Sequence, residues 1–173
     1  LRQDFPNLNV VPVEADFTKP FELPPEIAAL PRAGFFPGST LGNFEHADAL
    51  ALLRSMRQTM GEAGAALVGI DLDKDPALVE AAYNDAAGVT AAFTLNLLAH
   101  LNRALGADFD LGAFRHRAVY DRARQRIETT LVSTRAQAVR VGGQSFDFAE
   151  GEPVLVEYSH KYDDAGFAAL VAR

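Results

Sequence analysis

An α/β fold with a doubly wound parallel sheet is predicted by three features of this sequence. Three apolar runs, 8–17, 33–40 and 65–72, have the length and composition of buried strands. Between the second and third runs, apolar residues recur every three or four positions, which is typical of a helix. After Asp73 the pattern changes to a helix pair followed by short strand-like runs. This change predicts a second, α+β lobe inserted into the parallel sheet.

Residues 1–73 are expected to supply part of the sheet. The strand at 8–17 ends near Asp16 and Phe17. The stretch 18–32 contains four prolines and is expected to cross the surface with at most one helical turn. A helix is predicted after Asn43, ending at Gly61 and Gly64, from the spacing of Leu50, Leu53, Met56 and Met60. The run 65–72 reads as a strand that is buried on both faces.

Residues 74–161 are expected to form the inserted lobe, and residues 162–173 a helix that returns to the first part. Two helices are predicted in 74–110, with Pro76 in the first turn and a break near Gly88. The second helix carries an apolar stripe that needs a partner surface, formed by Val89, Phe93, Leu97, Leu101 and Leu105. Strands joined by glycine-containing turns are then expected in the runs 114–121, 126–141 and 145–159.

Composition excludes several classes of protein. The 173 residues are 49% hydrophobic and 23% charged, so the chain can bury a core. The net charge of −7 and the absence of a basic stripe argue against a nucleic-acid partner, and acidic residues interrupt the arginines between 115 and 126, which reads as a solvated strand and turn. No apolar run could span a bilayer and there is no cysteine, so we expect a cytoplasmic protein without a membrane partner. The oligomeric state is not predicted.

The bend "PGSTLGN" is the first candidate for a binding site. It follows a predicted strand, and ligands of open α/β sheets bind beyond the carboxyl ends of strands. Gly38 and Gly42 allow a sharp bend and close approach, and Asn43 offers an amide donor and acceptor. The simpler interpretation is that Asn43 only caps the following helix.

Asp16 and Phe17 form a second candidate. An acid beside an aromatic ring could hold the amino group and the face of an adenine. A strand end followed by a turn would look the same.

The stretch "VLVEYSHKY" is the third candidate. In a strand, Glu157 and Ser159 share one face, and Tyr158 and His160 share the other. A carboxylate beside a hydroxyl suits a ligand with two nitrogens, such as imidazole, although exposed edge residues would give the same pattern. Tyr83 lies near the predicted helix break, where its hydroxyl could point into a cleft. The four histidines are widely separated, so no metal site is predicted.

Together, "FFPGSTLGNF", the segment from "GIDLDKDP" to "AFRHRAVY", "RIETTLVS" and "VEYSHKY" resemble the SAM-dependent, histidine-specific N-methyltransferases. Enzymes of that family trimethylate the α-amino group of L-histidine to hercynine in ergothioneine biosynthesis. The resemblance covers nearly the whole chain. It implies a Rossmann-like class I methyltransferase sheet, here partial, with an inserted α+β substrate-binding lobe, and S-adenosyl-L-methionine as cofactor.

Residue by residue, the resemblance implies two sets of contacts. The cofactor set contains Asp16 and Phe17 at the adenine, and Gly38 as a backbone position beside the cofactor. The substrate set consists of Asn43 and Tyr83 at the amino-acid end, with Glu157 and Ser159 at the imidazole. No covalent enzyme intermediate is implied, so no catalytic nucleophile is predicted.

The sequence also departs from the family pattern. Thr129 stands where the family often has methionine, and Asn84 where aspartate is common; either could tune the choice of substrate. The family's Gly-rich cofactor loop, the acid that holds the ribose and a tyrosine-bearing substrate segment would precede Leu1. We therefore expect a fragment that is inactive by itself. Two alternatives stay open: an N-methyltransferase of the same fold acting on another amino acid or amine, and a non-catalytic fragment.

Overall fold

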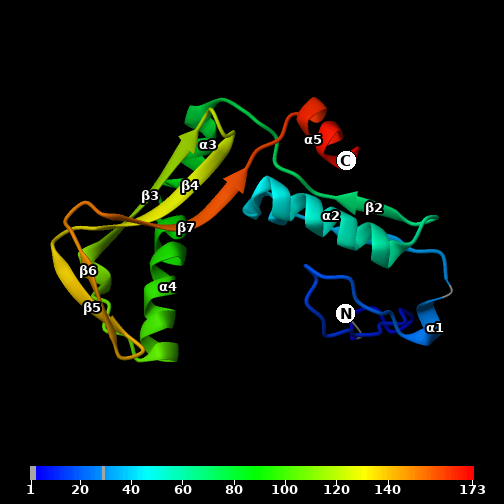
Figure 1. Cartoon of the computed structure of the whole chain (residues 1–173), viewed down its shortest axis with the longest axis horizontal. Coiled ribbons are helices and arrows are strands. Elements are labelled where there is room, and N and C mark those ends of the chain that lie inside the picture. The colour runs from blue at the N-terminus through cyan, green and yellow to red at the C-terminus, as the bar shows by residue number, and fades with distance from the viewer. Residues whose placement is uncertain (1–2, 29) are drawn as a thin grey trace.

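The computed structural model describes residues 3–28 and 30–173, which form two lobes side by side (Figure 1). The first lobe contains, in chain order, α1 (Pro25–Ala28), β1 (Ala33–Phe36), η1 (Thr40–Asn43), α2 (His46–Met60), β2 (Ala65–Val68) and, after the second lobe, α5 (Asp164–Val171). The second lobe contains α3 (Pro76–Tyr83), α4 (Val89–Leu105), η2 (Leu111–Ala113), β3 (Phe114–Asp121), β4 (Arg126–Ser133), β5 (Gln137–Val141), β6 (Gln144–Phe148) and β7 (Pro153–His160). The mixed α/β class is confirmed. Within the described residues, no helix has the length and apolarity that a membrane crossing requires.

The first lobe is a parallel β1–α2–β2 unit. The strands pair in register from Ala33 opposite Ala65 to Phe36 opposite Val68. Helix α2 and α5 meet over a small core formed by Leu41, Ala49, Leu52, Tyr162 and Leu170. The predicted helix is confirmed, and it ends at Gly61, which adopts a φ of 79° that other residues rarely reach.

The predicted strand at 8–17 is wrong. These residues form turns and irregular backbone, and most of their side chains are exposed. Within the described part of the chain, β1 and β2 pair only with each other, so no third parallel strand receives the hydrogen bonds of 8–17. An apolar run without a neighbouring strand cannot satisfy its backbone as a strand.

The expectation that 65–72 is buried on both faces is also wrong. Phe35 and Leu67 lie opposite each other in the register and are 71% and 66% exposed. Phe36 and Val68, at the next register position, pack against the core under α2. Among the residues that the structure describes, the sheet is therefore covered on one face only.

The second lobe combines a three-stranded antiparallel sheet, in the order β3–β4–β7, with the hairpin β5–β6. Gly142 and Gly143 form the hairpin turn with φ values of 56° and 84°. The strands predicted within 114–121, 126–141 and 145–159 are confirmed. Helix α4 closes a core formed by Leu98, Ala113, Phe114, Leu131 and Val139. Helix α3 closes another, formed by Val79, Ala118, Tyr120 and Ile127.

The break between α3 and α4 has a local cause. Asp75 caps α3 by accepting from the backbone N–H of Ala77, and Asp85 accepts from the N–H groups at the start of α4. The expected partner of the apolar stripe on α4 is not found in the described residues, where Val89 and Phe93 are 68% and 73% exposed. Helix α4 instead packs through the adjacent face that carries Leu98.

The two lobes meet where β7 ends. Gly42 in η1 lies so close to β7 that an added Cβ would be 2.7 Å from the carbonyl oxygen of His160. Leu72 and Tyr162 form a parallel bridge just beyond, so the chain leaves and re-enters the first lobe at one point. This junction places the bend that contains Gly42 beside the end of β7, whose tip lies next to the start of α2 (Figure 1).

Candidate functional site

The centre of the candidate site is a hydrogen-bonded group between α3 and the end of β7. The hydroxyl of Tyr83 lies 2.7 Å from Oγ of Ser159. The ammonium group of Lys161 donates to both, at 2.8 Å to each oxygen. The same ammonium lies 4.7 Å from the centre of the Tyr83 ring. Two of the predicted substrate residues, distant in sequence, are therefore in direct contact.

Lys161 is a site residue that the sequence reasoning missed. Its side chain is fully buried, and Asp71 supplies the counter-charge at 2.9 Å. The signal was the period of the strand, because Glu157, Ser159 and Lys161 are spaced by two and so share a face. Lysine side chains are usually exposed, so this spacing alone did not indicate that Lys161 belongs to the site.

The side chain of Asp71 is 29% exposed, so it lies between the buried ammonium of Lys161 and solvent. Burial acts to raise the pKa of its carboxyl group, but hydrogen bonds from Lys74 and Lys161 outweigh burial and hold that pKa below the ordinary value of 3.8. The ionised form of Asp71 is thus favoured by folding.

A pH dependence follows from Asp71. Because its pKa is lower in the folded than in the unfolded chain, its stabilising contribution is complete above pH 3.8 and is lost as the pH falls through the lowered value. We expect the unfolding free energies of the native protein and Asp71→Asn, measured in urea, to converge below pH 3.8. A difference that stays constant down to the acid limit would contradict the assigned ion pair.

Glu157 lies two residues before Ser159 on the same face of β7. Its carboxylate is half-buried and makes no hydrogen bond or ion pair with the described residues. Thr129, which is 4% exposed, is its register partner on β4, next to an irregularity at Thr129 and Thr130. The carboxylate is therefore available to a ligand, and Thr129 lies beside it.

Asn84 has a different environment. Its amide bridges α3 and β3, accepting from the N–H of Ala118 at 3.1 Å and donating to the Ala118 carbonyl at 2.9 Å. It also donates to the carbonyl of Glu80. The side-chain amide of Asn84 thus holds the end of α3, with the preceding residue Tyr83, against the sheet.

Asn43 lies at the end of η1 with an exposed side chain. The interpretation that it caps α2 is wrong, because the N-cap is Glu45 and no side chain makes the capping bond. Gly42 packs η1 against the end of β7, so Asn43 lies next to this junction in the first lobe. Among the described residues, no hydrogen bond joins Asn43 to Tyr83, Glu157 or Ser159.

The three predicted cofactor residues gather near the end of β1. The ring of Phe17 is 6.0 Å from that of Phe36, and 49% of Phe17 stays exposed. Gly38 has a φ of 71°, and an added Cβ there would meet no atom within 4 Å. An exposed aromatic face beside open backbone fits an adenosine group.

The carboxylate of Asp16 is bound by residues that follow it closely in the chain. It accepts from the hydroxyl and the N–H of Thr18 and pairs with Lys19 at 2.9 Å. The hydroxyl of Thr18, followed by Lys19, lowers the pKa of Asp16 to about 2. Asp16 is thus a fixed anion next to Phe17.

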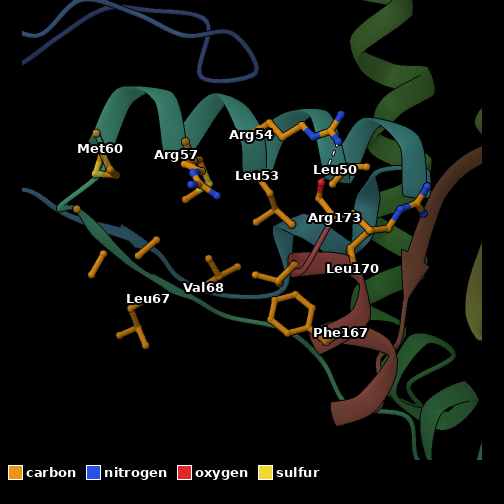
Figure 2. Close-up of a pocket in the computed structure, with 16 residues that line it drawn as sticks. Leu50, Leu53, Arg54, Arg57, Met60, Leu67, Val68, Phe167, Leu170 and Arg173 are labelled. Carbon is orange, nitrogen blue, oxygen red and sulfur yellow. Dashed lines mark hydrogen bonds between the residues drawn. The ribbon is translucent and has the colours of Figure 1, made fainter.

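An apolar groove of about 540 Å³ lies away from these residues, between α2, β2 and α5 (Figure 2). Leu53, Leu67 and Phe167 line it, and Arg54 donates to the carbonyl of Arg173 at its end. None of the candidate residues lines this groove, so it is not the candidate site.

Arg126 corrects the interpretation of the arginines as solvated. Its side chain is 8% exposed, pairs with Glu45 at 2.7 Å and with Glu128 at 2.6 Å, and stacks on the ring of Tyr158. Burial acts to lower its pKa, but the bonds to Glu128 and Glu45 outweigh burial and raise it. Arg126 thus binds the start of α2 to the face of β7 opposite Glu157 and Ser159.

Comparison with known proteins identifies the family of this chain. The sequence model of the family described as "Histidine-specific methyltransferase, SAM-dependent" matches residues 1–173. The chain belongs to this family. The resemblance seen in the sequence motifs is therefore confirmed, and with it SAM as the cofactor of the histidine-specific methyltransferases.

The curated relatives include histidine methyltransferases and a tryptophan methyltransferase. The chain is 39% identical to a histidine N-alpha-methyltransferase of Mycolicibacterium smegmatis over 98% of its length, and 35% identical to one of Mycobacterium tuberculosis over 99%. It covers 53% and 54% of those proteins, so it spans about half the length of the curated relatives. It is also 32% identical to an L-tryptophan methyltransferase of Psilocybe serbica, over 87% of the chain and 42% of that protein.

Proposed function

We propose that the protein carrying this chain is an N-methyltransferase that trimethylates the α-amino group of L-histidine to hercynine. The observation that carries the proposal is the free carboxylate of Glu157 on the same strand face as Ser159, which contacts Tyr83. In this proposal β1 and β2 belong to a Rossmann-like sheet, residues 1–73 form its cofactor-binding part, residues 74–161 the substrate-binding lobe, and residues 162–173 the return helix.

Each residue has a defined task in the proposal. Glu157 accepts a hydrogen bond from one imidazole nitrogen, and the hydroxyl of Ser159 serves the other. Asn43 and Tyr83 hold the amino and carboxylate end of the substrate, while Lys161 fixes the hydroxyls of Tyr83 and Ser159. Phe17, Asp16 and Gly38 receive the adenosine part of the cofactor.

SAM supplies an electrophilic methyl group on sulfur. Each transfer needs a neutral amine whose lone pair forms the N–C bond as the C–S bond breaks, which leaves S-adenosylhomocysteine. The first and second transfers are each followed by loss of a proton from the nitrogen, and the third gives a quaternary ammonium that has no proton to lose. The residues named above contribute by alignment and by excluding water, since a fixed approach geometry lowers the entropic barrier to transfer.

The test is the binding of L-histidine, in the presence of S-adenosylhomocysteine, to the whole protein that contains this chain. We expect Glu157→Gln to weaken L-histidine binding by about 10- to 100-fold, because a charge-assisted hydrogen bond is worth about 1.5–3 kcal/mol. Titration calorimetry measures it, and mass spectrometry of the product counts the methyl groups.

Glu150→Gln is the matched control, because Glu150 lies exposed in the turn before β7. Binding of S-adenosylhomocysteine is expected to stay unchanged in both variants. Equal weakening of both ligands in Glu157→Gln, or no weakening of L-histidine, would contradict the imidazole role.

Another amino acid as substrate is the second candidate, and the relative named L-tryptophan methyltransferase favours it. The buried Thr129 beside Glu157 is the position where such a choice would be made. Titrating L-tryptophan in the same experiment separates the two candidates, since an indole offers one N–H where imidazole offers two nitrogens.

A further inference from the structure

Three side chains with metal-binding groups meet on the face of β7 opposite Glu157 and Ser159. Glu45 and His46 come from the start of α2, and His160 is the last residue of β7. One ligand atom from each residue lies within 4.8 Å of the other two. His46 and His160 are far apart in the sequence, so their spacing could not indicate the cluster.

His160 is the unusual member of this group. It is 2% exposed, yet neither of its ring nitrogens has a hydrogen-bond partner in the described residues. Buried polar groups are almost always satisfied, so an orphaned imidazole points to an absent partner.

The geometry around His160 leaves room for an ion. Oε2 of Glu45 lies 3.8 Å from Nε2 of His160, too far for a hydrogen bond. The other oxygen of Glu45 accepts from Arg126 and is thereby held in place. The rings of His46 and His160 meet edge to face, with centroids 4.7 Å apart.

We propose that Glu45, His46 and His160 form a binding site for a divalent transition-metal ion, with Zn²⁺ as the best fit. Two imidazoles and a carboxylate are a known zinc ligand set. Atoms at about 2.0–2.2 Å from one tetrahedral ion lie about 3.5 Å apart, so the exposed side chains of Glu45 and His46, now within 4.8 Å of His160 and of each other, would close in on the ion. A cavity of about 620 Å³ reaches Glu45, His46 and His160, which gives the ion an entry path and water a fourth coordination position.

Nearby cations do not oppose the ion strongly. Arg126 is shared between Glu45 and Glu128, and Arg124 pairs with Asp121 at 2.7 Å. Glu45 thus meets the ion as a carboxylate whose second oxygen is free. The ion would join the start of α2 to the end of β7, whose other face carries Ser159.

The test is the binding of zinc chloride to the metal-stripped protein, measured by titration calorimetry and by thermal unfolding. We expect one equivalent to bind at micromolar or lower concentration and to raise the unfolding temperature. His46→Ala removes an exposed ligand without opening the core and should weaken binding by at least about tenfold. Co²⁺ should give the visible absorption of a tetrahedral site in the native protein and lose it in His46→Ala.

His100→Ala is the matched control, because His100 is exposed on α4, away from the cluster. Unchanged binding in His100→Ala together with weakened binding in His46→Ala supports the site. No zinc binding, or equal effects of the two substitutions, would overturn it. L-histidine is left out of the titration, so the result is independent of the proposed methyltransferase activity.

Discussion

Gly69→Ala is expected to destabilise the protein by about 3 kcal/mol, as overpacking of rigid atoms does in its more severe cases. A Cβ at Gly69 would lie 2.1 Å from the carbonyl oxygen of Gly38 and 2.9 Å from its nitrogen. These are backbone atoms, and the N–H of Gly69 is held by the carbonyl of Phe36 at 2.8 Å. Neither segment can move without breaking the β1–β2 pairing, so the structure cannot accommodate the added methyl group.

Urea unfolding of Gly69→Ala measures this loss, with Gly112→Ala as control. Gly112 has an ordinary φ, and an added Cβ would meet only Oδ1 of Asp110, at 3.4 Å. We expect the control to change the unfolding free energy by less than about 1 kcal/mol. Similar values for both variants would show that the ends of β1 and β2 are not in close contact. In the whole protein, Gly69→Ala should also weaken cofactor binding, because it displaces Gly38, which we propose to lie beside the cofactor.

Asp71→Asn is expected to lower the free energy of unfolding by about 3 kcal/mol, and Lys161→Met by less. The order follows from burial, because the ammonium of Lys161 is fully buried whereas 29% of the Asp71 side chain is exposed. Removing Asp71 leaves a buried charge unpaired, which is the costly case. Removing the ammonium leaves a carboxylate that water and Lys74 can still serve, and Tyr83 and Ser159 keep their mutual bond.

Lys74→Met is the matched control, since Lys74 pairs with the same carboxylate at 2.5 Å but is half exposed. Exposed pairs contribute little, so a loss within about 1 kcal/mol is expected. Chemical unfolding of the three variants gives the comparison. A larger loss for Lys161→Met than for Asp71→Asn would mean that the ammonium is not the group that burial penalises.

Local signals in the sequence predicted the second lobe well. The helix pair follows from Pro76 and Gly88, and the strands follow from turns whose glycines adopt positive φ. These features depend on neighbours in the chain, which a single sequence displays. The family resemblance placed Tyr83 and Ser159 at opposite ends of one substrate, and their direct contact was not predicted, because no local rule joins α3 to β7.

The failures in the first lobe have a different origin. An apolar run such as 8–17 becomes a strand only if another strand accepts its hydrogen bonds, and a single sequence does not display that partner. The same holds for Phe35 and Leu67, whose burial depends on a second layer over the sheet. Lys161 and His160 were missed because the burial of a charged or titratable side chain depends on groups brought from elsewhere, Asp71 for one and the start of α2 for the other.

The meeting of Leu72 and Tyr162 has a consequence for how the protein folds. The N–H of Asp73 donates to the carbonyl of Tyr162, and the N–H of Tyr162 to the carbonyl of Asp71, so the second lobe begins and ends at one hydrogen-bonded pair. A segment whose ends touch can form its own nucleus and then act as a short closed loop within the rest of the chain. Variation inside such a loop leaves the first lobe's connectivity untouched, so the second lobe can change in sequence without refolding the first.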